Sequence, residues 1–205
     1  MKVELRGSRG ITMFEVVLML TATSALAAAL MPTLTSTIRH AEIAKASTDM
    51  VNIRDAALNC FQTDMVQVPT INGAAIGTLV EILVSDGDIP RQVSATGSAE
   101  WQRPVDNVGG LVDFLERHIV TNNPRGNAAN AYSTIDLTPW RGAYMTAPIN
   151  PDPWGNRYAI NSEWANGGAE DVVVFSAGPD EEIDSAYAAN GLTAGDDDLV
   201  LLVQP

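Results

Sequence analysis

An apolar segment near the start of the chain limits what this protein can fold into. The segment, ITMFEVVLMLTATSALAAALMPTL, runs from Ile11 to Leu34 and follows a basic leader, residues 1–10. About 20 apolar residues in a helix span the hydrocarbon core of a bilayer, about 30 Å thick, and a basic flank favours the cytoplasmic side. We therefore predict a transmembrane helix over residues 11–32, with the leader in the cytoplasm.

A cleaved secretory signal peptide is the alternative interpretation of this segment. Such a peptide ends in a cleavage site of small residues, of the A-x-A type. Here no such site precedes a clear break, and a helical pattern continues straight through the end of the segment. The sequence therefore favours a retained anchor.

One acidic residue, Glu15, interrupts the apolar segment. A lone charge in lipid costs on the order of 3 kcal/mol on insertion scales, so a compensating partner is expected. A cut between Gly10 and Ile11 would create an α-amino group about one helical turn from Glu15. A neighbouring copy would bring the same amine to that carboxylate, so assembly of identical chains would pair the charge.

Residues 9–15, RGITMFE, resemble the cleavage and methylation motif of type IV prepilins and type II secretion pseudopilins. The resemblance implies that a prepilin peptidase cuts between Gly10 and Ile11 and methylates the new amine. It also implies that Glu15 acts in assembly. The helix would anchor a single-pass protein in the bacterial inner membrane, with its head in the periplasm or on the assembled filament. Pro32 lies where such helices commonly carry a kink-forming proline.

Beyond Pro32 the apolar residues lie on one side of a continuing helix. They recur at spacings of three and four, as in an amphipathic helix, at Ile43, Ala46, Met50, Ile53, Ala57, Cys60, Phe61 and Met65. We predict that residues 33–66 continue the membrane helix, which ends near Gln62 or Thr63. Cys60 is then a small buried residue rather than a reactive thiol.

The remaining residues, 67–205, form the predicted head. Strands are expected in runs rich in β-branched and aromatic residues, at 157–161, 171–176 and 199–203. Between the long helix and these strands we expect short helices at 76–84 and 110–120, and a loop over 91–107. Together these elements predict an α+β fold in which the long helix packs on a small antiparallel sheet.

The two histidines do not form a recognisable site in the sequence. His40 lies on a charged face of the long helix, and His118 lies in the predicted helix 110–120, without partners at metal-ligand spacing. We predict a surface or half-buried histidine at position 118 rather than a catalytic one.

The predicted head is acidic, and its acids cluster near the C-terminus. The chain has a formal net charge of -13, and loss of the basic leader makes it more acidic. This argues against nucleic acid as a partner. Like charges held close together repel unless a cation compensates them, and carboxylate oxygens suit calcium. The cluster therefore predicts either a calcium site or a solvated loop without metal, at Asp180, Asp196, Asp197 and Asp198.

Two motifs in this region, DPWGNRY at 152–158 and VVFSAGPD at 173–180, resemble the major pseudopilin of type II secretion systems. The resemblance implies a calcium (Ca²⁺) site with ligands from the side chains of Asp180, Asp197 and Asp198 and the backbone carbonyls of Ala177 and Gly195. Asp196 is an alternative ligand one position away. The chain departs from the family in a longer loop after Asp180 and in an apparent insertion at about 91–137.

The same resemblance implies a structural role. The chain would be a subunit of a pseudopilus filament, stabilised by calcium, that drives protein export through a type II secretion system. The implied partners are further copies of the chain, the prepilin peptidase, minor pseudopilins, the inner-membrane assembly platform and membrane lipid. A type IV pilin for adhesion, motility or DNA uptake shares the anchor, although many of those have a C-terminal disulfide, which a single cysteine cannot form.

A membrane-anchored periplasmic enzyme is the remaining alternative. The sequence contains no nucleophile elbow, no HExxH and no phosphate-binding loop. We therefore expect no catalytic activity.

Overall fold

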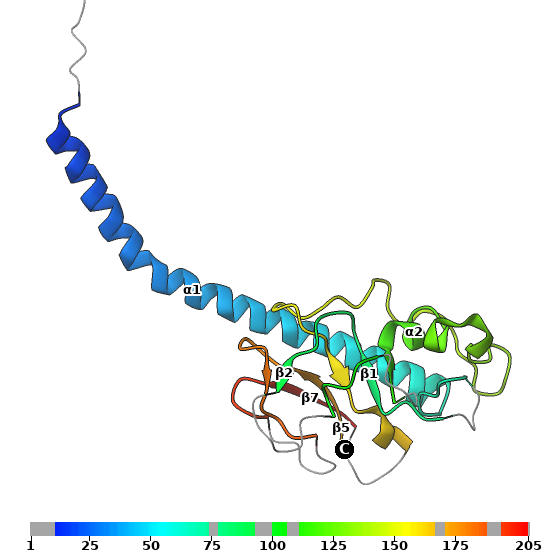
Figure 1. Ribbon diagram of the computed structural model, residues 1–205. Helices are drawn as coiled ribbons and strands as arrows, with labels where there is room; N and C mark the ends of the chain where they lie inside the picture. Colours follow the sequence, from blue (N-terminus) through cyan, green and yellow to red (C-terminus); the bar gives the residue numbers. More distant parts are fainter. Residues whose placement is uncertain are drawn as a thin grey trace, which may run out of the picture. The chain divides into compact units, whose positions relative to one another are not determined.

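The computed structural model describes residues 11–73, 78–92, 100–105, 111–166, 171–187 and 194–204. The chain divides into two units, Met1–Ala41 and Glu42–Pro205 (Figure 1). The predicted leader, with Gly10, lies outside the described residues.

The first unit is the N-terminal part of helix α1, which spans Met13–Ala57 and continues through Pro32. All its described residues are exposed. Its serine and threonine hydroxyls donate to backbone carbonyls three or four residues earlier, at Thr21, Thr23, Ser24, Thr35, Ser36 and Thr37. These bonds satisfy polar groups that lipid could not. Within the described residues, one helix, Met13–Asp64, is long and apolar enough to cross a membrane.

The second unit contains the predicted apolar stripe of the long helix. Helix α1 passes directly into a π-helical turn, η1 (Leu58–Asp64). Most buried residues of this continuous helix lie at predicted positions, which confirms its amphipathic character: Ala46, Met50, Ile53, Ala57, Cys60 and Phe61. Ala56 is buried although it was not predicted, and the predicted Ile43 is only half-buried. Its end at Asp64 agrees with the predicted end near Thr63. Cys60 is fully buried, as predicted.

A five-stranded sheet forms the centre of the head. Its strand order is β3-β1-β4-β5-β7, with β3 (Val112–Phe114), β1 (Ile82–Val84), β4 (Ala159–Ile160), β5 (Val172–Ser176) and β7 (Leu199–Gln204). Strand β1 pairs with β3 in parallel, whereas the other pairs are antiparallel. The sheet is therefore mixed, and the prediction of an antiparallel sheet is wrong at the β1–β3 edge. The three predicted strands correspond to β4, β5 and β7.

The short helix predicted at 76–84 is a strand instead. Residues 74–77 lie outside the described part of the chain, and Ile82–Val84 form β1, whose three residues are all buried. A short apolar run is compatible with either a buried helical turn or a buried strand. Here the residues form a strand because they pair with β3 on one side and with β4 on the other.

The helix predicted at 110–120 is divided between two elements. Val112–Phe114 form β3, and the helix α2 is limited to Leu115–Ile119. Val112–Phe114 take an extended conformation because they pair with β1. The helical spacing of the apolar residues gave no sign of this long-range pairing. His118 on α2 is fully buried, so the prediction of a surface or half-buried histidine is wrong.

The loop predicted over 91–107 begins with a paired strand. Arg91–Gln92 form β2, which runs parallel to β6 (Glu182–Ile183) in a separate two-stranded sheet. Of the remaining loop, residues 93–99 and 106–107 lie outside the described residues. Short 3-10 turns complete the head: η2 (Pro124–Gly126), η3 (Ala128–Asn130) and η4 (Ser162–Asn166).

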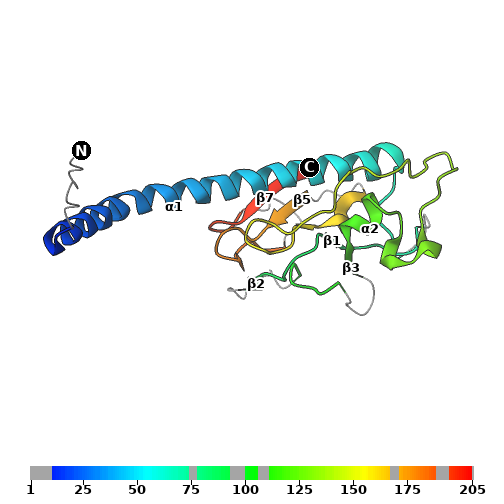
Figure 2. The ribbon, with the colours of Figure 1, turned by 90° about the horizontal axis from the view of Figure 1, so that it is seen from above.

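Both faces of the sheet are buried, and β5 shows this most clearly. Val172 and Val174 lie in a core cluster with Met50 and Ile53 of α1, and Val173 and Phe175 lie in a second cluster on the other face. Figure 2 shows β5 and β7 running beside the C-terminal half of α1. In the second cluster the ring of Trp101 stacks on that of Phe175, with ring centres 4.8 Å apart.

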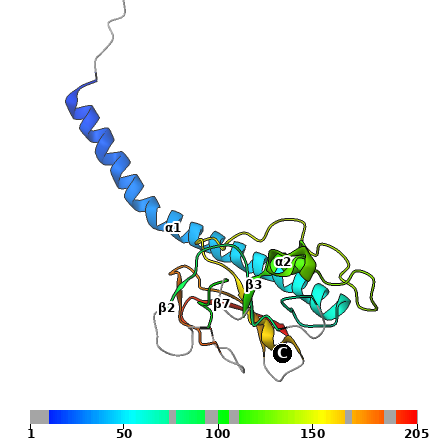
Figure 3. The same cartoon turned by 45° about the vertical axis from the view of Figure 1, so that its right-hand side comes forward.

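The α2 helix lies beside the end of the long helix (Figure 3). The rings of Phe61 and His118 are 6.3 Å apart, and the indole N–H of Trp140 donates to the carbonyl of His118 at 2.8 Å. The segment predicted as an insertion, about 91–137, therefore contributes both an edge strand and a covering helix to the head.

Replacement of Ile53 by alanine tests the packing of the helix on the sheet. Ile53 is 1% exposed, so Ile53→Ala should lower the free energy of unfolding by about 2–5 kcal/mol through lost burial and a cavity. The neighbouring exposed residue gives a matched control, and Asn52→Ala should change it by less than about 0.5 kcal/mol. Denaturant unfolding of the full chain in detergent measures both. Equal unfolding midpoints for the two variants would contradict this packing.

Candidate functional site

Three carboxylates come together where the chain leaves β5 and returns to β7. Asp180 follows β5, and Asp196 and Asp197 precede β7. Each offers an oxygen, and these three oxygens all lie within 4.8 Å of one another. Since calcium binds oxygen at 2.3–2.6 Å, one ion can contact oxygens separated by up to about 5 Å. The described residues can therefore hold a metal ion here.

Two glycines allow the chain segments of this site to approach closely. A Cβ on Gly178 would lie 2.3 Å from the backbone oxygen of Asp197, and Gly178 has a φ of +72°. A Cβ on Gly195 would lie 2.6 Å from the backbone of Asp184. Side chains at these positions would push the two segments apart, so the glycines are needed to bring the carboxylates together.

The cluster differs in one member from the ligand set implied by the resemblance. Asp180 and Asp197 are brought together, but the third carboxylate is that of Asp196. The Oδ2 atom of Asp198 instead accepts backbone N–H groups of Asp184 at 3.0 Å and Ser185 at 2.6 Å. Asp198 therefore fastens the returning segment to the chain after β6.

The two implied backbone ligands lie close to these carboxylates in sequence. Ala177 is fully buried at the end of β5. The carbonyl of Gly195 accepts the backbone N–H of Asp198 at 2.9 Å and has a second lone pair for a cation.

The electrostatics of the site favour a cation. Asp198, next to the cluster but not a member of it, is 6% exposed, and its Oδ1 atom makes no hydrogen bond within the described part of the chain. Burial raises the pKa of Asp198 to about 6, and burial together with the charge of Asp180 raises the pKa of Asp197. Carboxylates that are costly to ionise gain most from a bound positive charge, so the donor set fits a hard ion such as calcium.

A second arrangement of functional interest lies at the start of α1. The backbone N–H and the hydroxyl of Thr12 donate to Oε2 of Glu15 at 2.8 and 2.9 Å, and the backbone N–H of Glu15 donates to the Thr12 hydroxyl at 3.3 Å. This reciprocal pair is a capping box. Thr12 was not among the predicted site residues, although the T-x-x-E spacing before an apolar run signals the cap.

The cap changes the environment expected for Glu15. Its carboxylate has donors within its own chain, at the end of the helix where the backbone dipole favours a negative charge. Ile11, the residue before the cap, is 72% exposed. Gly10, the other predicted residue of the junction, lies outside the described residues.

Comparisons with known protein families, with curated proteins and with solved structures find no significant match for this chain.

Removal of single carboxylates tests the metal site. Asp180→Asn and Asp197→Asn should each weaken calcium binding by about tenfold or more, because each removes a charge from a cluster that shares one ion. Asp136→Asn makes the same charge change at an exposed position and should leave binding unchanged. Calorimetric titration of the full chain in detergent measures the affinities.

Chelation gives an independent measurement of the same site. A ligand that binds only the folded state raises its stability, so a chelator should lower the melting temperature of the wild-type chain. The chelator should have little effect on the Asp197→Asn variant. A melting temperature of the wild type that does not depend on calcium would contradict the metal site.

Proposed function

We propose that this chain is a structural subunit of a membrane-anchored filament, a pseudopilus of the kind that drives protein export through a type II secretion system. In this proposal a prepilin peptidase cuts before Ile11, and α1 serves as both anchor and assembly surface. The acidic head then forms the outer surface of the filament, and calcium stabilises it.

The observation that carries the proposal is Glu15 at the first turn of an apolar helix. The surrounding residues expose many large apolar side chains, and Phe14, Leu18 and Leu30 are each more than half exposed. Such a surface must be covered by lipid or by other helices. The charge of Glu15 is the one feature of this surface that lipid disfavours. A neighbouring copy that offers an amine removes this cost, so the charge favours the assembled state over the isolated subunit.

The capping box supports a role for Glu15 before assembly as well. The bonds from Thr12 reduce the cost of the carboxylate in a single chain, but they supply no opposite charge. The α-amino group of a neighbouring Ile11 would supply it. The isolated subunit would thus be tolerated in the membrane and the assembled form preferred.

The acidic cluster supports the role proposed for calcium. The two segments that it joins lie on either side of a long connection before the last strand, β7. An ion shared by Asp180, Asp196 and Asp197 would hold that strand in place without a disulfide, which the single Cys60 cannot supply. This arrangement suits a head outside the cytoplasm, where calcium is abundant.

Substitution of Glu15 tests the role of its charge in assembly. Glu15→Ala should give a stable, membrane-inserted subunit that fails to form filaments, because the pairing with a neighbour's amine is lost. Glu15→Gln is the matched variant, since its amide oxygen still accepts from Thr12 but carries no charge. It should fail equally. Electron microscopy of filaments from cells with the prepilin peptidase measures assembly.

The two variants separate the charge from the cap. Normal filaments from Glu15→Gln together with none from Glu15→Ala would assign the effect to the cap alone. Normal filaments from both variants would exclude the proposed mechanism.

Substitution at the predicted cleavage junction tests processing. Gly10→Val should block the cut, because the resemblance implies that the peptidase requires glycine before it. Mass spectrometry of the membrane-extracted chain should find the wild type beginning at a methylated Ile11 and the variant beginning at its leader. An intact leader on the wild type in peptidase-containing cells would overturn the proposed function.

A further inference from the structure

A buried network of ionisable side chains surrounds His118, apart from the acidic cluster. The His118 side chain is fully buried. Its Nε2 atom lies 3.0 Å from Oδ2 of Asp113, and its Nδ1 atom lies 2.6 Å from the hydroxyl of Tyr132. The same hydroxyl accepts the backbone N–H of Thr70 at 3.2 Å. One imidazole therefore links β3, α2, the residues around Tyr132 and the chain that follows the long helix.

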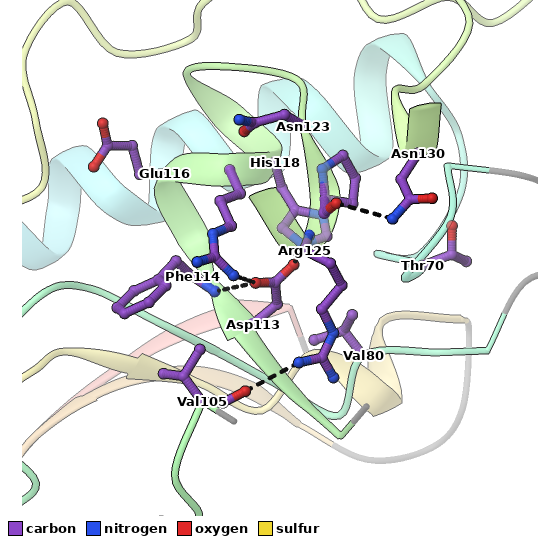
Figure 4. A network of polar contacts seen from close by, with 12 residues as sticks. Thr70, Val80, Val105, Asp113, Phe114, Glu116, His118, Asn123, Arg125 and Asn130 are labelled. Carbon is purple, nitrogen blue, oxygen red and sulfur yellow. Dashed lines mark hydrogen bonds and ion pairs between the residues drawn. The ribbon is translucent and has the colours of Figure 1, made fainter. Parts of the chain in front are cut away.

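The network holds an irregular segment, residues 121–138, against the head. Asn122 and Tyr132 close this segment on itself by two hydrogen bonds of 2.7 and 3.1 Å. Its Arg125 backbone N–H donates to Oδ2 of Asp113 at 2.7 Å. Figure 4 shows Asp113 lying between Phe114, His118 and Arg125. We call residues 121–138 the fastened segment.

Asp113 determines which nitrogen of His118 carries the proton. Burial alone would raise the pKa of Asp113, but the hydrogen bonds that it accepts from His118, Arg125 and Arg117 lower the pKa below its ordinary value of 3.8. The carboxylate is then an acceptor only, so Nε2 must donate to it. Nδ1 is left as an acceptor for the Tyr132 hydroxyl. Burial also raises the pKa of Tyr132, which keeps this hydroxyl neutral.

A second proton on His118 would disturb this arrangement. Nδ1 would become a donor, and the Tyr132 O–H would have to turn to the carbonyl of Thr70, at the longer distance of 3.4 Å. The new positive charge would also face Arg117 and Arg125, with the carboxylate of Asp113 opposite them.

The other ionisable groups near His118 do not offset this charge. Glu116, on the same helix, points away from the network (Figure 4). Cys60, on the turn packed against α2, remains a neutral thiol because burial raises its pKa. Its Sγ atom contacts the carbonyl of His118 at 4.0 Å.

We propose that the chain of hydrogen bonds from Asp113 through His118 and Tyr132 to Thr70 is an acid-sensitive lock, which holds the fastened segment in place and releases it when His118 becomes doubly protonated. The segment lies on the head surface, and its exposed tip includes Ile135 and Leu137, which are 90% and 100% exposed. Release would therefore change an exposed apolar part of the head. The lock does not depend on the proposed filament function.

The direction of the pH dependence follows from burial. Burial, assisted by the charges of Arg117 and Arg125 and opposed by Asp113, lowers the pKa of His118 below its ordinary value of 6.5. The opened segment therefore binds the proton more readily than the closed one, and the lock weakens as the pH falls below about 6.5. The contribution of Asp113 is lost only when the pH falls below the ordinary pKa of an aspartate, 3.8. The two effects are thus separated in pH.

Amide hydrogen exchange of the full chain in detergent tests the lock. Between pH 7.5 and pH 4.5, protection of peptides from the fastened segment should fall after correction for intrinsic exchange. The fall should approach tenfold for each pH unit below 6.5 over which the closed form keeps His118 neutral, because opening then takes up one proton. Peptides from β5 should keep their protection. His118→Gln should remove the difference, since glutamine can donate to Asp113 and accept from Tyr132 but does not titrate here.

His40→Gln provides the matched control, because His40 is exposed and far along the chain from the network. It should show the same loss of protection as the wild type. Equal loss in His118→Gln and in the wild type would overturn the proposal, as would full protection of the wild-type segment at pH 4.5.

Nitrogen NMR of the imidazoles decides the matter if His118→Gln does not fold. The His40→Gln background leaves one histidine signal, and at pH 7.5 its Nε2 should be protonated and its Nδ1 unprotonated. Loss of protection together with protonation of Nδ1 supports the lock. Loss of protection while the ring stays neutral, or protonation without loss, overturns it.

Discussion

Burial of both faces of β5 is the constraint around which the head is organised. A strand whose alternate residues enter two different cores needs a covering layer on each side. The second half of α1 provides one layer through Met50 and Ile53, and the chain around Trp101 provides the other through its stack on Phe175. The carboxylate cluster follows from the same arrangement, since it forms where the chain leaves this strand and returns as β7.

The sequence predicted those helices and strands whose apolar residues follow a clear local pattern. The strands that it did not predict depend on pairing between distant segments of the chain. The three-and-four spacing from Ala46 to Met65 identified a helix and its buried side, and the run VVVF identified β5. Nothing local to Ile82–Val84 or Val112–Phe114 distinguishes a strand from a helical turn, because their extended form depends on each other as partners. Long-range contacts also explain why His118 was wrongly expected near the surface. Its buried ring is satisfied in part by the hydroxyl of Tyr132, and no local sequence pattern connects these two residues.

The candidate sites were only partly predictable, again for physical reasons. The sequence places the acidic residues in one loop but does not say which of them meet. That depends on the close contact between chain segments at Gly178 and Gly195. As a result Asp196 lies with Asp180 and Asp197, whereas Asp198 accepts backbone N–H groups. At the other end of the chain, the capping bonds of Thr12 were readable from spacing, since a cap involves residues only three apart. The negative charges of carboxylates are therefore accommodated in two ways in this chain. Backbone N–H groups donate to some of them, and others lie close enough together to share a cation.

The direct backbone contact at Gly178 has a consequence for protein engineering. The chain that leaves β5 at Gly178 lies against the backbone of Asp197, just before β7, and Gly195 lies against Asp184, which follows β6. The connection between residues 187 and 194 thus begins and ends at fixed points, and doubling the length of such a connection costs only about 0.6 kcal/mol. Extra residues inserted at this connection should therefore leave the final strand in place at little cost in stability.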